Sequence, residues 1–136
     1  MYNIDPKLWG PSLWKFSHYY TLAYPDKPTE EDINNTRNFF SNLYKYLPCE
    51  KCRYNYQQHL LKTPLTNKVL QSRTNLVLWL LNLHNQVNIM TGKKEITYDE
   101  FENIYINKDE KPKKKLTFIY ILICIVILLV IINKVI

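Results

Sequence analysis

The chain has 136 residues, a formal net charge of +6 and three cysteines. This length provides for one small domain with a single core and an additional segment. Three cysteines are too few for a secreted fold held together by disulfides. Much of the positive charge comes from a lysine cluster near the C-terminus, so we interpret it as a membrane-surface signal rather than a nucleic-acid-binding one.

Helical periodicity dominates the first half of the chain. A first helix is predicted from about Pro11, since proline suits a first turn, to about Ala23. Thr29, followed by three acidic residues, resembles a helix cap and predicts a second helix that continues to Leu47. Pro48 then interrupts this helix.

The pattern remains helical in the second half. A third helix is predicted to begin at the cysteines and to end near residue 61, and residues 62–73 form a polar connection. A fourth helix is predicted over residues 74–90 and a short fifth over residues 97–106. The fourth carries a regular apolar stripe, at Leu76, Leu80, Leu83 and Val87. Without any alternating strand pattern, the predicted fold class is all-α: a four-helix bundle plus a short fifth helix.

Residues 116–132 are uncharged and contain no proline. A helix needs about 20 residues, or as few as about 17, to cross a bilayer, so this run predicts a C-terminal transmembrane helix. Lysines gather before the run, whereas only Lys134 follows it, which predicts a tail-anchored protein whose N-terminal domain faces the cytosol. The predicted organisation is a domain over residues 1–107, a basic linker over 108–115, and the span with a short tail over 116–136.

Cys49 and Cys52 are the only cysteines outside the predicted span, which contains Cys124. At a helix N-terminus such a pair can form a small disulfide ring, and the helix favours a thiolate at Cys49, which makes it the accessible partner in exchange. Zinc would need about four ligands, and the histidines lack finger-like spacing. A thioredoxin fold would need strands. A helical flavin-linked dithiol site is the third possibility, and the cysteine spacing alone does not establish it.

Two further pairs of polar and aromatic residues share helix faces. Trp14 and His18 lie four residues apart on the first helix, and His84 and Asn88 lie four apart on the fourth, with Asn85 beside them. A planar ring cofactor needs aromatic stacking and a few directed hydrogen-bond donors, which facing helices could provide. Ordinary core packing is the simpler explanation for each pair taken alone.

Taken together, these motifs resemble the Erv/ALR family of FAD-linked sulfhydryl oxidases over about residues 9 to 105. The resemblance is carried by Gly10, Trp14 and His18, by Tyr24-Pro25-Asp26 and Pro28, by Pro48-Cys49 and Cys52, by Trp79-Leu80, by His84-Asn85, Val87 and Asn88, and by Gly92-Lys93. It implies a four-helix bundle with a short fifth helix, bound FAD and a homodimer. The implied cofactor-binding residues are Gly10, Trp14, His18, His84, Asn85, Val87, Asn88 and Lys93.

The resemblance also implies an activity. Cys52 would be the flavin-proximal sulfur and Cys49 the sulfur that meets the incoming thiol. Electrons would pass from substrate dithiols through this pair to FAD and then to oxygen, giving hydrogen peroxide and protein disulfides. The alternatives are a non-enzymatic tail-anchored helical adaptor and a zinc-binding module.

The chain departs from the family pattern at several positions. Pro11 stands where the family often has arginine, Leu47 where it often has tyrosine, and Leu81 where a cysteine of a second, structural disulfide is common. No second cysteine pair is present to relay electrons, so we expect a thiol-containing protein substrate or a separate thiol shuttle protein as partner. These features resemble the short viral members of the family, which act on the cytosolic side.

Overall fold

The computed structural model describes residues 3–107, and this part of the chain is helical without a strand. Its elements are α1 (Pro6–Ala23), α2 (Glu30–Asn42), the 3₁₀ helix η1 (Leu43–Tyr46), α3 (Glu50–Lys62), the short α4 (Asn67–Leu70), α5 (Arg73–Met90) and α6 (Tyr98–Tyr105). The all-α prediction is confirmed for these residues. Within residues 3–107 there is no helix with the length and apolarity needed to cross a membrane. The predicted span lies outside the described residues.

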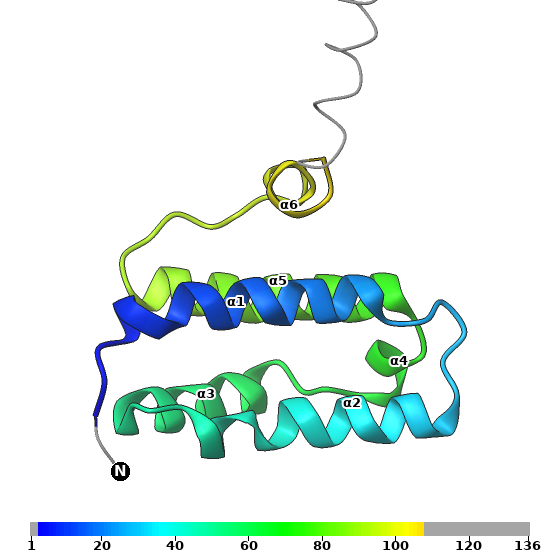
Figure 1. Cartoon of the computed structure of the whole chain (residues 1–136), viewed down its shortest axis with the longest axis horizontal. Coiled ribbons are helices and arrows are strands. Elements are labelled where there is room, and N and C mark those ends of the chain that lie inside the picture. The colour runs from blue at the N-terminus through cyan, green and yellow to red at the C-terminus, as the bar shows by residue number, and fades with distance from the viewer. Residues whose placement is uncertain (1–2, 108–136) are drawn as a thin grey trace, which may run out of the picture. The chain divides into compact units, whose positions relative to one another are not determined.

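The four longer helices before residue 98 form two layers (Figure 1). α1 and α5 lie side by side in one layer, and α2 and α3 make up the other. α6 is described here only as a separate element, because the chain divides into two compact units near its first residue.

The core between the two layers is built from the apolar faces of these helices. Leu76, Leu80 and Leu83 of α5 are buried, as the apolar stripe predicts, whereas Val87 is half-buried. Phe40 of α2 meets Trp79 edge-to-face with ring centroids 5.1 Å apart. The core thus fixes α5 against α2, and side chains elsewhere on α5 remain available for a site.

Side-chain caps set where several helices begin. Thr29 and Asp32 form a reciprocal capping box at the start of α2, so the predicted cap is confirmed. Ser72 caps α5 by accepting from the Asn75 N–H, and Cys49 caps α3. Because such side chains satisfy otherwise unpaired amides of the first turn, short sequence signals specify these three starts.

The start of α1 and the end of α2 differ from the predictions. α1 begins at Pro6, five residues before the predicted start, because Asp5 caps it with a carboxylate that accepts from the Lys7 N–H at 2.9 Å. Pro11 therefore lies inside the helix and removes only one main-chain bond. α2 ends at Asn42, and the chain tightens into η1 rather than continuing as an α-helix to Leu47.

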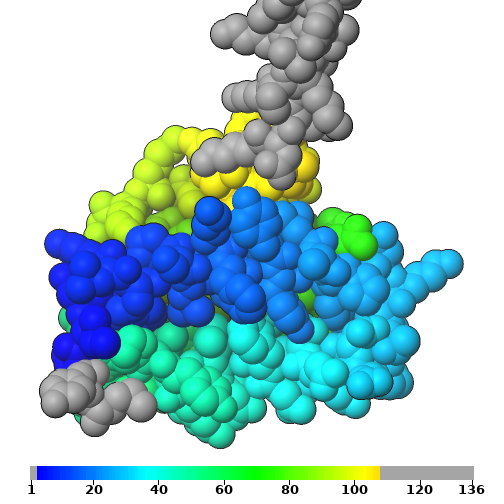
Figure 2. Space-filling view, in the orientation of Figure 1, coloured from blue at the N-terminus to red at the C-terminus, as the bar shows by residue number. Residues whose placement is uncertain are grey.

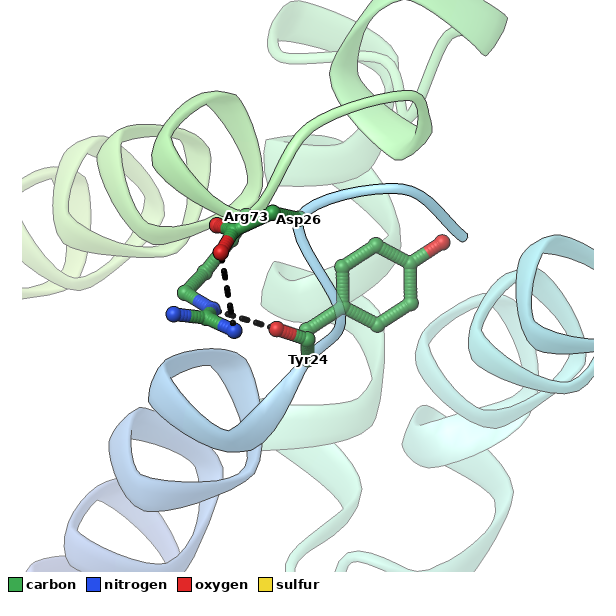
Figure 3. A network of polar contacts seen from close by, with 3 residues as sticks. All are labelled: Tyr24, Asp26 and Arg73. Carbon is green, nitrogen blue, oxygen red and sulfur yellow. Dashed lines mark hydrogen bonds and ion pairs between the residues drawn. The ribbon is translucent and has the colours of Figure 1, made fainter. Parts of the chain in front are cut away.

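A polar clasp joins the end of α1 to the start of α5 (Figure 3). Arg73 donates from Nε to the Tyr24 carbonyl and pairs with the Asp26 carboxylate at 3.3 Å. Tyr24 is buried, and its hydroxyl donates to the Leu70 carbonyl at 2.7 Å. The connection predicted as merely polar, residues 62–73, thus contains the one-turn helix α4 and is anchored by these bonds.

Candidate functional site

Cys49 and Cys52 form a disulfide at the N-terminus of α3, with their Cα atoms 5.1 Å apart. Cys49 is the N-cap residue, and its sulfur accepts from the Cys52 N–H at 3.2 Å. The helix N-terminus directs amide dipoles toward this sulfur, and these would stabilise a negative charge on it. A thiolate formed at Cys49 when the disulfide opens would therefore be favoured by the helix.

The exposure of the two sulfur residues runs against one expectation. Cys49 is only 6% exposed, whereas Cys52 is half-buried. The sequence predicted Cys49 as the accessible partner, and in this structure it is the more buried of the two. The N-terminal segment lies next to this residue, since the Ile4 N–H donates to the Pro48 carbonyl at 2.7 Å.

A second part of the site is an aromatic cluster formed by α1 and α5. The rings of Trp14 and His84 stack with centroids 4.0 Å apart and planes 7° apart. Nε2 of His18 lies 2.9 Å from Nδ1 of His84, a buried hydrogen bond between the two helices. The two faces that the sequence predicted, one on α1 and one on α5, therefore meet in the structure.

Both histidines of this cluster are neutral at physiological pH. Burial lowers the pKa of His18 to about 3, and the neighbouring His84 adds to this effect. Burial likewise lowers the pKa of His84 to about 4, with a contribution from the positive charge of Lys93. Neutral imidazoles can donate with one ring nitrogen and accept with the other, so the cluster offers directed hydrogen bonds without net charge.

The Asn85 side chain and the main chain of Asn88, both near the C-terminal end of α5, hold the segment that follows this helix. Asn85 donates to the Ile96 carbonyl at 2.9 Å and accepts from the Ile96 N–H at 2.8 Å. Asn88 is buried, and its main-chain carbonyl accepts from the Lys93 N–H at 2.8 Å. The structure thus gives Asn85 a partner within the chain, and it brings the exposed Lys93 to the same end of α5 as His84 and Asn88.

The remaining predicted residues are less constrained by the protein itself. A Cβ added at Gly10 would meet no atom of the described chain within 4 Å, so the space beside α1 is open at this position. Val87 is half-buried on α5. Trp14 and Cys52 both pack against the same core cluster, so the aromatic cluster and the dithiol share one supporting core.

Several residues of the site were not predicted. Asn3 accepts from the Glu50 N–H at 3.2 Å through Oδ1, and the Trp9 indole donates to the Ile4 carbonyl at 3.2 Å. His59, considered only as a zinc ligand, bonds through Nδ1 to Oε1 of Gln86 at 3.0 Å. Residues 3–107 contain no group of three or more histidine, cysteine or acidic residues that could hold a metal ion. No local sequence pattern marks these bonds, which join residues 5 to 47 positions apart.

This fold and site define a small helical protein with a disulfide at one helix N-terminus and a neutral aromatic and imidazole cluster between two other helices. The chain belongs to the Erv1/Alr family, whose model matches residues 11–106.

Viral relatives resemble the chain over most of its length. It is 51% identical over 116 residues to a probable FAD-linked sulfhydryl oxidase of Acanthamoeba polyphaga mimivirus, covering 85% of this chain and 80% of the relative. It is 33% identical over 97 residues to the FAD-linked sulfhydryl oxidase of African swine fever virus, covering 71% and 79%.

Solved structures agree on the fold. The crystal structure of the yeast Erv1 core matches with a TM-score of 0.68 at 21% identity, covering 79% of this chain and 89% of that one. The FAD binding domain of Erv1 from Saccharomyces cerevisiae gives a TM-score of 0.68 at 22% identity, covering 76% and 95%. At this identity the likeness establishes a common helical fold.

Proposed function

We propose that this protein is an FAD-linked sulfhydryl oxidase that introduces disulfides into thiol-containing proteins. The observation that carries the proposal is the Cys49–Cys52 disulfide at the start of α3, in a chain 51% identical to a viral relative named for this activity. Exchange with this disulfide releases a thiolate that the helix dipole stabilises, and Cys49, at 6% exposure, has to become accessible to the incoming thiolate.

The cysteines carry out the exchange with substrate. A substrate thiolate attacks Sγ of Cys49, the Cys49–Cys52 bond breaks, and Cys52 leaves as a thiolate. A second substrate thiolate then attacks the substrate sulfur of the mixed disulfide and releases Cys49. The substrate has gained a disulfide, and the pair has gained two electrons as a dithiol.

The residues of the aromatic cluster fit an FAD cofactor. Trp14 offers an aromatic face, His18 and His84 are neutral hydrogen-bonding rings, and the open space at Gly10 leaves room beside α1. We assign cofactor binding to these residues together with Val87, Asn88 and Lys93, whose exposed cation suits a phosphate group. When bound, FAD takes up the pair of electrons and delivers them to oxygen as hydrogen peroxide.

The experiment uses the full chain, purified in a mild detergent. We expect a yellow protein with a flavin absorbance band that consumes oxygen and releases hydrogen peroxide with dithiothreitol. Cys52→Ser should keep the flavin and lose turnover, whereas Cys124→Ser, outside the site, serves as the cysteine control. A folded preparation without flavin, or a Cys52→Ser protein with full turnover, would refute the assignment.

We further propose that residues 116–132 anchor the protein in a membrane with the catalytic domain on the cytosolic side, as the lysine distribution suggests. We expect resistance to alkaline extraction, and digestion of residues 1–107 by protease added to sealed membrane vesicles whose cytosolic face points outward. Release by alkali would contradict the anchor, and protection of the domain would reverse the orientation.

We also propose a homodimer. α1 exposes several large apolar side chains, among them Leu8 at 76% and Phe16 at 57%. Exposed apolar side chains that gather on one element are typical of a protein–protein interface. Sedimentation of the detergent-solubilised chain should give twice the protomer mass. Phe16→Glu should lower the sedimenting protein mass to that of one protomer. A monomeric wild-type protein would exclude this proposal.

A further inference from the structure

The backbone around Cys49 has the form of a one-residue strand edge. Cys49 is extended, with φ −155° and ψ 116°, because it lies between Pro48 and the first turn of α3. In an extended chain the carbonyl before a residue and the N–H after it point to the same side. The Pro48 carbonyl and the Glu50 N–H therefore form a matched acceptor and donor that flank Cys49.

Both of these groups are occupied by the N-terminal segment. The Ile4 N–H donates to the Pro48 carbonyl at 2.7 Å, and the Glu50 N–H donates to Oδ1 of Asn3 at 3.2 Å. Figure 1 shows this segment in blue as it passes beside the start of α3, and Figure 2 shows the blue N-terminal part of the chain on the same side of the molecule. Ile4 is 44% exposed, so these contacts lie on the outer side of the protein.

The segment makes an incomplete strand pair. The Asn3 side chain, rather than a main-chain carbonyl, satisfies the Glu50 N–H. The Ile4 carbonyl has no N–H to accept from at Pro48, and it accepts from the Trp9 indole at 3.2 Å. An extended peptide could supply both main-chain partners at once and would form a regular pair with the same edge.

The distances in such a pair suit thiol–disulfide exchange. In an antiparallel pair, a residue directly opposite Cys49 would be of the non-hydrogen-bonded type, with Cα atoms about 4.5 Å apart. Disulfides usually join Cα atoms about 4.4–6.8 Å apart. A substrate cysteine opposite Cys49 would therefore be close enough to form the mixed disulfide.

We propose that the Pro48 carbonyl and the Glu50 N–H bind the substrate as an extended segment with its cysteine opposite Cys49, and that Asn3 and Ile4 occupy this edge until substrate displaces them. The inference rests on the thiol oxidase function and names its substrate class: a cysteine in a strand-forming or unstructured segment. The residue before the substrate cysteine accepts from Glu50, and the residue after it donates to Pro48. The substrate thiolate then bonds to Sγ of Cys49 while Cys52 departs as a thiolate.

The edge can be altered at a single donor. Glu50 is the first residue of α3, a position that accepts proline, and Cys49 before it already has the extended backbone that proline favours. Glu50→Pro thus removes the N–H at this position and keeps helix α3 intact. Glu30→Pro, at the first position of α2, is the matched control for the same substitution elsewhere.

The assay compares two thiols on the full flavin-loaded chain: an unstructured peptide with one cysteine, and dithiothreitol, which has no backbone. We expect Glu50→Pro to lower the ratio of kcat/KM for peptide over dithiothreitol about fivefold, the loss that one neutral hydrogen bond brings. Glu30→Pro should leave the ratio within twofold of wild type. An unchanged ratio in Glu50→Pro, or an equal fall in both variants, would overturn the proposal.

A second comparison does not depend on the folding of a variant at Glu50. A peptide with N-methylalanine after its cysteine lacks the N–H that would bond to Pro48, and it should react about fivefold more slowly than the alanine peptide. Asn3→Ala should raise kcat/KM for the alanine peptide, because the resting occupant of the edge is weakened. Equal rates for the two peptides, or a fall in Asn3→Ala, would refute the edge. Failure of dithiothreitol to reduce the flavin would instead refute the thiol oxidase function itself.

Discussion

The imidazoles of His18 and His84 form a hydrogen bond between α1 and α5, with Nε2 of His18 2.9 Å from Nδ1 of His84. Since two protonated rings would both be donors, the bond requires at least one neutral ring that accepts. Trp14 stacks on His84 and covers the pair from α1. The bond therefore links the charge state of the cluster to the packing of the two helices that carry the proposed cofactor residues.

The first prediction concerns pH. Burial lowers the pKa of His18 to about 3 and of His84 to about 4, whereas an unfolded histidine titrates near about 6.5. Between these values the unfolded chain binds more protons than the folded one. The stabilising effect of the neutral rings is therefore complete above about pH 6.5 and is lost as the pH falls from there toward 4 and 3.

Urea unfolding of the cofactor-free full chain, followed by tryptophan fluorescence from pH 4.5 to 7.5, measures this dependence. The free energy of unfolding should fall with decreasing pH by up to about 1.4 kcal/mol per pH unit for each histidine. His18→Asn should reduce this slope by about half, since His84 remains. A slope that is the same in wild type and variant would contradict the assignment.

The second prediction concerns Trp14. Its ring lies against His84 at 4.0 Å, and we place it against the cofactor. Trp14→Ala should weaken FAD binding about tenfold or more, because aromatic stacking contributes about 1 kcal/mol beyond burial and the imidazoles lose their support. Trp14→Phe keeps an aromatic face and should retain most of the affinity.

Fluorescence titration of FAD into the cofactor-free chain gives the dissociation constants. Tyr46→Ala is the control, because Tyr46 is 75% exposed in η1 and belongs neither to the aromatic cluster nor to the proposed dimer surface on α1. Equal affinities for Trp14→Ala and Tyr46→Ala, in proteins that unfold at similar urea concentrations, would remove Trp14 from the cofactor site.

Local chemistry made much of this fold predictable. The cap at Thr29, the apolar stripe from Leu76 to Leu83 and the start of α3 at the cysteines each follow from residues within one or two turns of one another. The meeting of Trp14 with His84 is a contact between helices, and there the family resemblance supplied what periodicity could not.

The parts that the sequence did not predict depend on distant partners. Asn3 bonds to Glu50 across 47 positions, and nothing near either residue marks this pairing. Asn85 bonds both main-chain groups of Ile96, a contact that its predicted role toward the cofactor did not include. Pro11 suggested a helix start, but the carboxylate of Asp5 caps an earlier one. In each case a tertiary contact or a competing local cap decides the outcome.

The third prediction separates the two roles of Asn85. Its amide satisfies both main-chain groups of Ile96, so Asn85→Ala should leave the Ile96 N–H unpaired and speed its hydrogen exchange at least tenfold. Asn85→Asp keeps the acceptor for this N–H and should retain most of the protection. If exchange at Ile96 is unchanged in Asn85→Ala while FAD affinity falls, the side chain serves the cofactor directly rather than the segment after α5.

The fourth prediction concerns the clasp between α1 and α5 (Figure 3). Arg73 donates to the Tyr24 carbonyl and pairs with Asp26, whose side chain is 74% exposed. The bond to the carbonyl lies beside the buried Tyr24 and joins the end of α1 to α5, whereas water screens the exposed ion pair. We therefore expect Arg73→Ala to lower the free energy of unfolding by about 1–2 kcal/mol, and Asp26→Asn by less than about 0.5 kcal/mol.

Urea unfolding of both variants, repeated in high salt, tests the ranking. If Asp26→Asn costs as much as Arg73→Ala, and salt abolishes both effects, the ion pair rather than the carbonyl bond fastens the two helices.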